Sequence, residues 1–198
     1  MFGSRLSFLF VLILSWSLHS HMAHGAKPTS SFFFVTSLGH WQEGLRIEGN
    51  EESYSLNSSA VATGLGAGYV FPFPSLSLVV QTQATFALTD VGFGPGNSTP
   101  VTFQGKNLSQ LGNRFDVTLL SRLSQRVAVG CGVPIVTTFF LNPEIAPGYH
   151  LEKSPLVKLG FFVDLRIVRN NKLVFNPKIG FLNNLQNYFA IMDFQFHL

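Results

Sequence analysis

The chain has a single cysteine among its 198 residues. Because Cys131 has no partner within the chain, an internal disulfide is excluded. This absence also excludes the small secreted domains that several disulfide bridges hold together. Cys131 falls on the apolar side of an alternating segment, where a small apolar residue is sufficient explanation.

Charge is scarce as well. Asp, Glu, Lys and Arg make up 12% of the residues, and the formal net charge is +3. The basic residues are scattered along the chain, so the sequence shows no basic run for nucleic acid. We therefore expect no nucleic-acid partner, and no residue cluster predicts a cofactor or a metal.

Long hydrophobic runs are missing beyond the first 25 residues. Within them, Arg5 precedes an apolar run from Leu6 to Leu18, and Ala23-His24-Gly25 supplies the small residues of a cleavage site. The run of about 13 residues is shorter than the ~20 that a membrane-spanning helix needs, which disfavours a helical anchor. We predict a cleaved signal peptide over residues 1–25 and one domain over residues 26–198.

Apolar residues are nevertheless abundant: 46% of the chain is hydrophobic, and 21 residues are Phe. Strands that place these residues at alternate positions account for this content without any helix. Eight segments alternate in this way: 32–41, 60–71, 75–88, 114–123, 127–135, 156–168, 173–181 and 188–198. In the clearest, Val157 to Ile167, the apolar positions span about 11 residues, the length of a tilted membrane-spanning strand.

The links between these segments alternate in length. Short turns are expected at Pro72-Phe73-Pro74, at Ser124-Gln125 and at Asn170-Asn171. Long loops are expected over 42–59, 89–112 and 142–155, while 183–187 is a short exception. Glu43, Glu48, Glu51 and Glu52 predict that the first loop is acidic and solvated, with binding of a divalent ion or basic partner as the alternative.

Alternation alone does not decide which face points outward. A soluble lipocalin-like barrel would turn the apolar face inward, and Gly39-His40-Trp41 is similar to the lipocalin G-x-W signature. Against this, Phe and Leu on nearly every strand would overfill a small barrel. In a membrane the same residues face lipid, and the sheet must close because lipid offers its edges no hydrogen bonds. We predict an all-β, antiparallel, up-and-down transmembrane barrel of eight strands.

The last segment, YFAIMDFQFHL, gives the clearest resemblance. It combines an aromatic-rich outer face with an inner face that becomes polar, and the chain resembles the small eight-stranded bacterial outer-membrane barrels, the group of OmpA, OmpX and OmpW. The resemblance implies a monomer in the outer membrane of a Gram-negative-type bacterium, with both termini periplasmic and with lipopolysaccharide and other outer-membrane lipid around it. It also implies recognition by the barrel-assembly machinery through the last strand, although Leu198 stands where the group usually has Phe. The residues of this assembly signal are Tyr188, Phe194, Phe196 and Leu198.

The predicted inward faces carry eight charges. They are Arg114, Asp116, Arg122, Lys158, Asp164, Arg166, Lys178 and Asp193. A charge inside a barrel must be paired or hydrated, so we expect a polar network that fills the lumen. The alternative is that these charges line a path for ions through the barrel.

We expect no enzymatic activity, although one catalytic arrangement is conceivable. His40 and His150 would meet at the outer rim, with Glu43 or Glu144 orienting them and Ser154 as nucleophile, to form a lipid A deacylase-like site. The preferred hypothesis is a structural or adhesive barrel whose loops meet the exterior. The alternatives are a narrow channel for small or apolar solutes, a lipid A-modifying enzyme and a soluble ligand-binding barrel.

Overall fold

A computed structural model describes residues 31–49, 52–93, 107–141, 144–146, 149–151, 156–170, 172–183 and 187–198. The predicted signal peptide and Ser154 lie outside these residues. The strands are β1 (Ser31–Gly49), β2 (Glu52–Pro72), β3 (Leu76–Phe93), β4 (Asn107–Arg122), β5 (Val127–Phe140), β6 (Glu144–Ala146), β7 (Tyr149–Leu151), β8 (Leu156–Val168), β9 (Leu173–Leu182) and β10 (Tyr188–His197). Among the described residues, no helix is long and apolar enough to cross a membrane.

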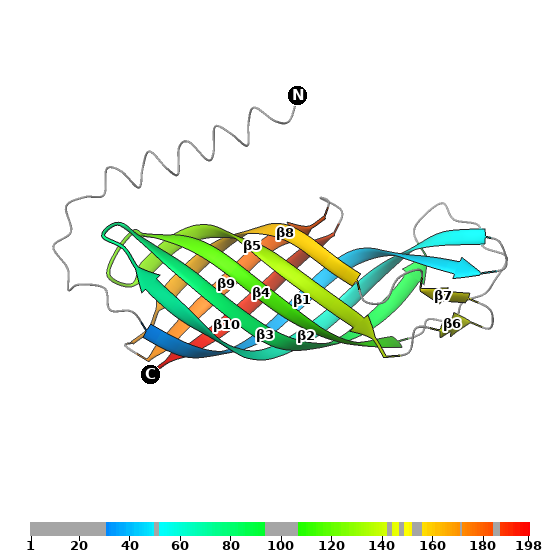
Figure 1. Cartoon of the computed structure of the whole chain (residues 1–198), viewed down its shortest axis with the longest axis horizontal. Helices are drawn as coiled ribbons and strands as arrows, with labels where there is room; N and C mark the ends of the chain where they lie inside the picture. Colours follow the sequence, from blue (N-terminus) through cyan, green and yellow to red (C-terminus); the bar gives the residue numbers. More distant parts are fainter. Residues whose placement is uncertain are drawn as a thin grey trace, which may run out of the picture.

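Eight long strands close into an antiparallel barrel, which confirms the predicted fold class (Figure 1). Each long strand pairs with its neighbour in the order β1-β2-β3-β4-β5-β8-β9-β10, and β10 returns to pair with β1. That closing ladder runs from Phe33 opposite His197 to Gln42 opposite Tyr188. Ser31 and Leu198 therefore lie at one end of the barrel, together with the three short turns. We call this the turn end and the opposite end the loop end.

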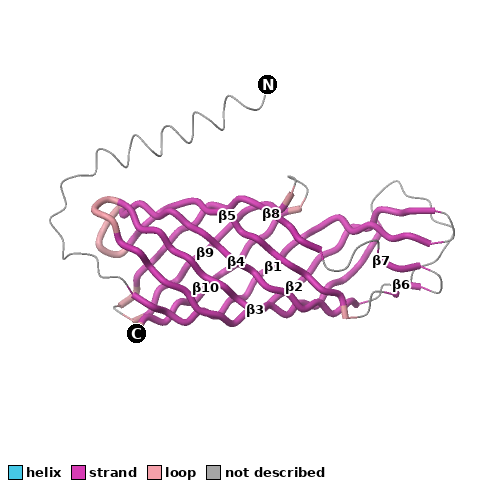
Figure 2. Tube along the Cα trace, in the orientation of Figure 1, coloured by secondary structure: helices cyan, strands magenta, loops and turns pink. Residues whose placement is uncertain are grey.

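The strands reach further at the loop end than the sequence predicted. Strands β1 and β2 stay paired as far as Gly49 opposite Glu52, so most of the predicted loop 42–59 is a hairpin. Strands β3 and β4 likewise extend into the predicted loop 89–112. The short strand β7 pairs with β1, and β6 pairs with β7, which adds two strands to the sheet beyond the loop end of the barrel (Figure 2). The prediction was wrong here because small polar residues on the outer face of β2 obscure the strand alternation.

The faces of the barrel are inverted relative to a soluble protein. On the outside, Leu65 is 70% exposed, Ile179 68% and Val157 64%. On the inside, the side chains of Gln83 and Asp193 are fully buried. A water-soluble barrel buries its apolar face and exposes its polar one, so the lipocalin-like alternative is wrong.

Inward glycines make room for the aromatic rings that fill the interior. A Cβ on Gly68 would collide with the Phe33 ring, and one on Gly132 would collide with the Phe162 ring. Both rings are fully buried. Gly68 is the cross-strand partner of Phe33 and Gly132 that of Phe162, so each ring lies over a neighbouring residue that has no side chain.

A substitution at Gly66 tests how closely the backbones of β2 and β3 approach each other. A Cβ on Gly66 would overlap the backbone oxygen of Thr82, which cannot turn away as the end of a flexible side chain can. We expect Gly66→Ala to lower the free energy of unfolding by about 1–3 kcal/mol, as overpacking does. Urea unfolding of the refolded barrel in detergent, followed by tryptophan fluorescence, measures the change.

Gly44→Ala is the matched control. Gly44 lies on the exposed face of β1, and its added Cβ would meet only Asn187 Oδ1, at 3.8 Å. An unfolding midpoint for Gly66→Ala equal to that of Gly44→Ala would contradict the close approach of β2 to β3.

Candidate functional site

The interior of the barrel is built in layers, which can be followed along the inward residues of β1. Phe33 and Val35 belong to an apolar cluster at the turn end, and Ser37 belongs to a polar layer. Trp41 belongs to a second apolar cluster, and Glu43 to a second polar layer. A third apolar cluster, which includes Leu45 and Ile47, fills the loop end. The lumen is therefore not uniformly polar, as the sequence had predicted, but alternates between apolar and polar layers.

The first polar layer contains a cluster of four buried charges, here called the ion cluster: Arg114, Asp116, Lys178 and Asp193. Arg114 Nη2 lies 2.8 Å from both carboxylate oxygens of Asp193, and its Nε lies 3.2 Å from Asp116 Oδ2. Lys178 Nζ lies 2.8 Å from an oxygen of each carboxylate. Two cations and two anions cancel, so the cluster carries no net charge into a region shielded from water.

Amide side chains surround the ion cluster. Gln81 Nε2 donates to Asp116 Oδ2 at 2.9 Å and to Asp193 Oδ2 at 2.8 Å. Ser37 Oγ donates to Gln83 Oε1 at 2.7 Å, and Gln83 Nε2 donates to Asp193 Oδ1 at 3.3 Å. These residues were not part of the predicted lumen network, which included charged residues alone. Their alternation on β3 was the available signal.

The other predicted lumen charges occupy different positions. Asp164 is buried and accepts a hydrogen bond from Asn176 Nδ2 at 2.5 Å. Arg166 is half-buried near the turn end, where its Nη2 lies 2.8 Å from His197 Nε2. Arg122 is exposed at the same end. These three residues are not members of the ion cluster.

Lys158 pairs with a residue that the sequence had placed in a solvated loop. Its Nζ contacts Glu43 Oε2 in the second polar layer, and both side chains are almost fully buried. Gln110 Nε2 lies 3.4 Å from Glu43 Oε1 in the same layer. The prediction that Glu43 is solvated was wrong because β1 continues past Trp41 and keeps its odd-numbered residues inward.

Apolar layers enclose the ion cluster from both directions. Toward the loop end lie the bulky residues Trp41, Phe162 and Phe189, and Lys178 Nζ sits 4.9 Å from the centroid of the Phe162 ring. Toward the turn end lie Phe33, Val35, Val70, Val79 and Leu120. Charges enclosed in this way interact strongly, and losing one partner leaves the other unpaired at high cost.

The proposed catalytic histidines do not come together. His40 lies on the outer face of the wall, paired with Val61 on one side and Ala190 on the other. His150 pairs with Glu48, eight residues further along β1, which corresponds to roughly 26 Å. The hypothesis of a lipid A deacylase-like site at His40 and His150 is therefore wrong.

The four residues of the predicted assembly signal lie on the outer face of the barrel. Tyr188 Oη donates to Gln42 Oε1 at 2.6 Å, and the Phe194 ring packs edge-on against Phe175 at 5.7 Å. Phe196 and Leu198 are exposed near the turn end. They form one stripe along β10.

Solved structures of outer-membrane proteins are similar to this fold. OprG from Pseudomonas aeruginosa shares 8% identity and a TM-score of 0.47, over 84% of this chain and 93% of that one. Neisserial surface protein A shares 8% identity and a TM-score of 0.41, over 86% and 99%. Ail, the attachment invasion locus protein of Yersinia pestis, shares 12% identity and a TM-score of 0.36, over 85% and 95%. No protein-family model and no curated protein matches the sequence.

Asp193 offers a direct test of the ion cluster. In Asp193→Asn the two cations face one carboxylate, and we expect the free energy of unfolding to fall by about 3–5 kcal/mol. Adding Lys178→Met restores neutrality and should recover about 1–3 kcal/mol of this loss, measured as the coupling energy in urea unfolding.

Arg169→Gln at the exposed turn end is the control, and it should change stability by less than about 0.5 kcal/mol. Purely additive effects of the Asp193 and Lys178 substitutions would show that the two side chains do not interact.

Proposed function

We propose that this protein is a monomeric, integral outer-membrane β-barrel with a plugged interior, which displays its loop end as a structural or surface-interaction platform. One observation carries the proposal: the wall is apolar on the outside, while buried charges lie inside. Lipid is the solvent that this arrangement fits, because alternate residues face hydrocarbon and lumen. A closed sheet has no free edge, which agrees with a monomer surrounded by lipid.

Aromatic residues near the turn end support placement in a bilayer. Outward rings gather where the wall meets the short turns: Phe32, Phe34, Phe71, Phe73 and Phe196. Rings at such positions form the interfacial girdles of membrane barrels. Between the ends, the outward residues of β8 from Val157 to Ile167 rise about 25 Å when the strand tilts by ~45°, which equals the apolar band of such barrels.

The loop end supports a role in surface interaction. The outer face of β2 is polar near the loop end, where it carries Ser55, Asn57 and Ser59, and apolar nearer the turn end. The polar part of the wall is compatible with contact with water. The hairpin of β1 and β2 continues through this region as ordered sheet with an apolar cluster on its inner side. A stiff, polar projection of this kind presents a fixed surface to another molecule.

Lipopolysaccharide and other outer-membrane lipids are the proposed surroundings of the wall, and the barrel-assembly machinery is the proposed transient partner. The outward stripe of Tyr188, Phe194 and Phe196 supports recognition through β10. Both termini are proposed to be periplasmic, because Ser31, the first described residue, and Leu198 share an end with the short turns.

Location and orientation are testable together. In a Cys131→Ala background, Asn57→Cys marks the loop end and Gln125→Cys marks the turn end. On intact cells, a membrane-impermeant maleimide should label the first cysteine at least tenfold more than the second, and permeabilisation should make the two labelling levels equal.

The protein should also fractionate with outer membranes and migrate differently on gels with and without heating. Equal labelling on intact cells, or recovery in the periplasmic supernatant, contradicts the proposal.

The plugged interior predicts that the barrel does not conduct. The layer of Trp41, Phe162 and Phe189 interrupts the polar interior, so planar bilayers containing the protein should show no steady single-channel conductance. A known open porin prepared in the same detergent controls for insertion. A stable, reproducible conductance would replace the structural proposal with the narrow-channel alternative.

A further inference from the structure

The turn end carries a concentration of positive charge that the function proposed above does not use. Five cations lie in the two turns beside β5 or in the strand residues next to them: Arg122, Arg126, Arg166, Arg169 and Lys172. The described residues at this end, in 31–35, 69–78, 118–130, 165–170, 172–175 and 194–198, include no Asp or Glu. The described side chains at this end therefore carry net positive charge, which the carboxylate of Asp164 offsets in part at Arg166.

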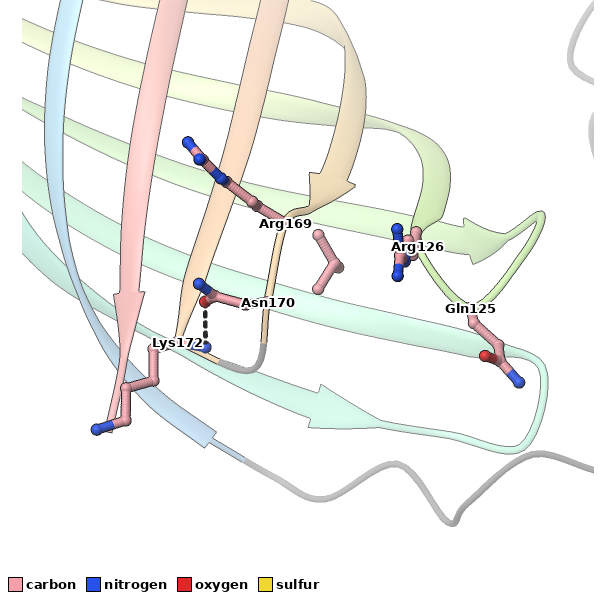
Figure 3. Close-up of a pocket in the computed structure, with 6 residues that line it drawn as sticks. Gln125, Arg126, Arg169, Asn170 and Lys172 are labelled. Carbon is pink, nitrogen blue, oxygen red and sulfur yellow. Dashed lines mark hydrogen bonds between the residues drawn. The ribbon is translucent and has the colours of Figure 1, made fainter.

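Three of these cations share a pocket of about 550 Å³, shown in Figure 3. Arg126 comes from the turn between β4 and β5, and Arg169 and Lys172 come from the turn between β8 and β9. The two turns are neighbours, since Val168 N donates to the Arg126 carbonyl at 2.8 Å. Gln125, Val168 and Asn170 complete the lining. The volume suits an ion of head-group size.

The backbone of both turns is held in place by side chains. Ser124 Oγ accepts hydrogen bonds from Arg126 N at 3.2 Å and Val127 N at 3.1 Å. Asn170 Oδ1 accepts from Lys172 N at 2.9 Å and Leu173 N at 2.8 Å. Arg126, Arg169 and Lys172 are exposed, and within the described chain none of them forms an ion pair. The three cations therefore line one pocket between two fixed turns, and no ion pair within the described chain neutralises them.

The level of the pocket along the barrel axis indicates which kind of anion it meets. Ile167 on β8 and Leu173 on β9 are the outward apolar residues nearest the turn. Arg169 lies two residues beyond Ile167, or about 7 Å along an extended chain. The head-group layer on each side of the hydrocarbon core is about 5–8 Å thick. With the wall in a bilayer, Arg169 reaches the level of the lipid phosphates, and Arg126 and Lys172 line the same pocket.

We propose that this pocket binds the phosphate of anionic phospholipid head groups in the leaflet at the turn end. The proposal rests on the membrane location proposed above. The two guanidinium groups offer paired N–H donors that match phosphate oxygens, and Lys172 adds a point charge. The cluster thereby selects an anionic lipid over a zwitterionic one and fixes how deep this end of the barrel sits.

Native mass spectrometry of the folded protein in detergent micelles tests the binding. Phosphatidylglycerol and phosphatidylcholine with identical acyl chains compete at several total concentrations. The wild type should retain phosphatidylglycerol preferentially. In the variant Arg126→Gln/Arg169→Gln/Lys172→Gln, loss of roughly fivefold per cation should weaken that binding by on the order of 100-fold. Arg46→Gln, an exposed arginine near the loop end, is the control and should change it less than about twofold.

The outcomes separate the lipid site from the membrane location. Equal retention of both lipids by the wild type overturns the proposal, as does unchanged retention by the triple variant. If the protein binds inorganic pyrophosphate but shows no preference between the two lipids, the pocket binds a soluble phosphate and the proposal of a lipid head group is rejected. Heat-dependent gel migration verifies that each variant is folded. Insertion of the wild type into vesicles without any lipid preference would leave the membrane location intact and reject only the head-group site.

Discussion

The pairing of β10 with β1 is the interaction on which the rest of the molecule depends. In a hydrocarbon solvent every backbone N–H and C=O must find a partner within the protein, and only closure provides one for both outermost strands. Ten residue pairs, from Phe33–His197 to Gln42–Tyr188, complete the ring. Closure with eight strands then sets the internal width. In this narrow interior, Phe33 and Phe162 each pack over a glycine on the neighbouring strand.

Polar and charged side chains in this interior are shielded from bulk water, so they must satisfy one another. The ion cluster satisfies charge by exact neutrality and by hydrogen bonds from Gln81 and Gln83. The apolar clusters on either side exclude water, which strengthens those contacts and raises the cost of breaking any one of them. The packing that stabilises the barrel is therefore the same packing that fills its interior.

The sequence predicted the strand number and the outward face because alternation is a local property that survives any uncertainty at strand ends. It did not predict the paired continuation of β1 and β2, since Ser55, Asn57 and Ser59 read equally well as a loop. Nor did it predict that Glu43 meets Lys158 or that Arg114 meets Asp193, which lie on strands far apart in the chain. Such partners are set by strand register and barrel curvature, and neither is written in a local pattern.

The position of Asp193 on β10 ties charge balance to the order of assembly. Arg114 and Lys178 belong to β4 and β9, which precede it along the chain, and both lose a carboxylate partner when β10 is missing. A sheet without β10 is thus open at its seam and lacks one of the two carboxylates of the ion cluster. The same strand completes the backbone ladder on the outside and the ion pairs on the inside, so the seam of the barrel is closed by both kinds of contact.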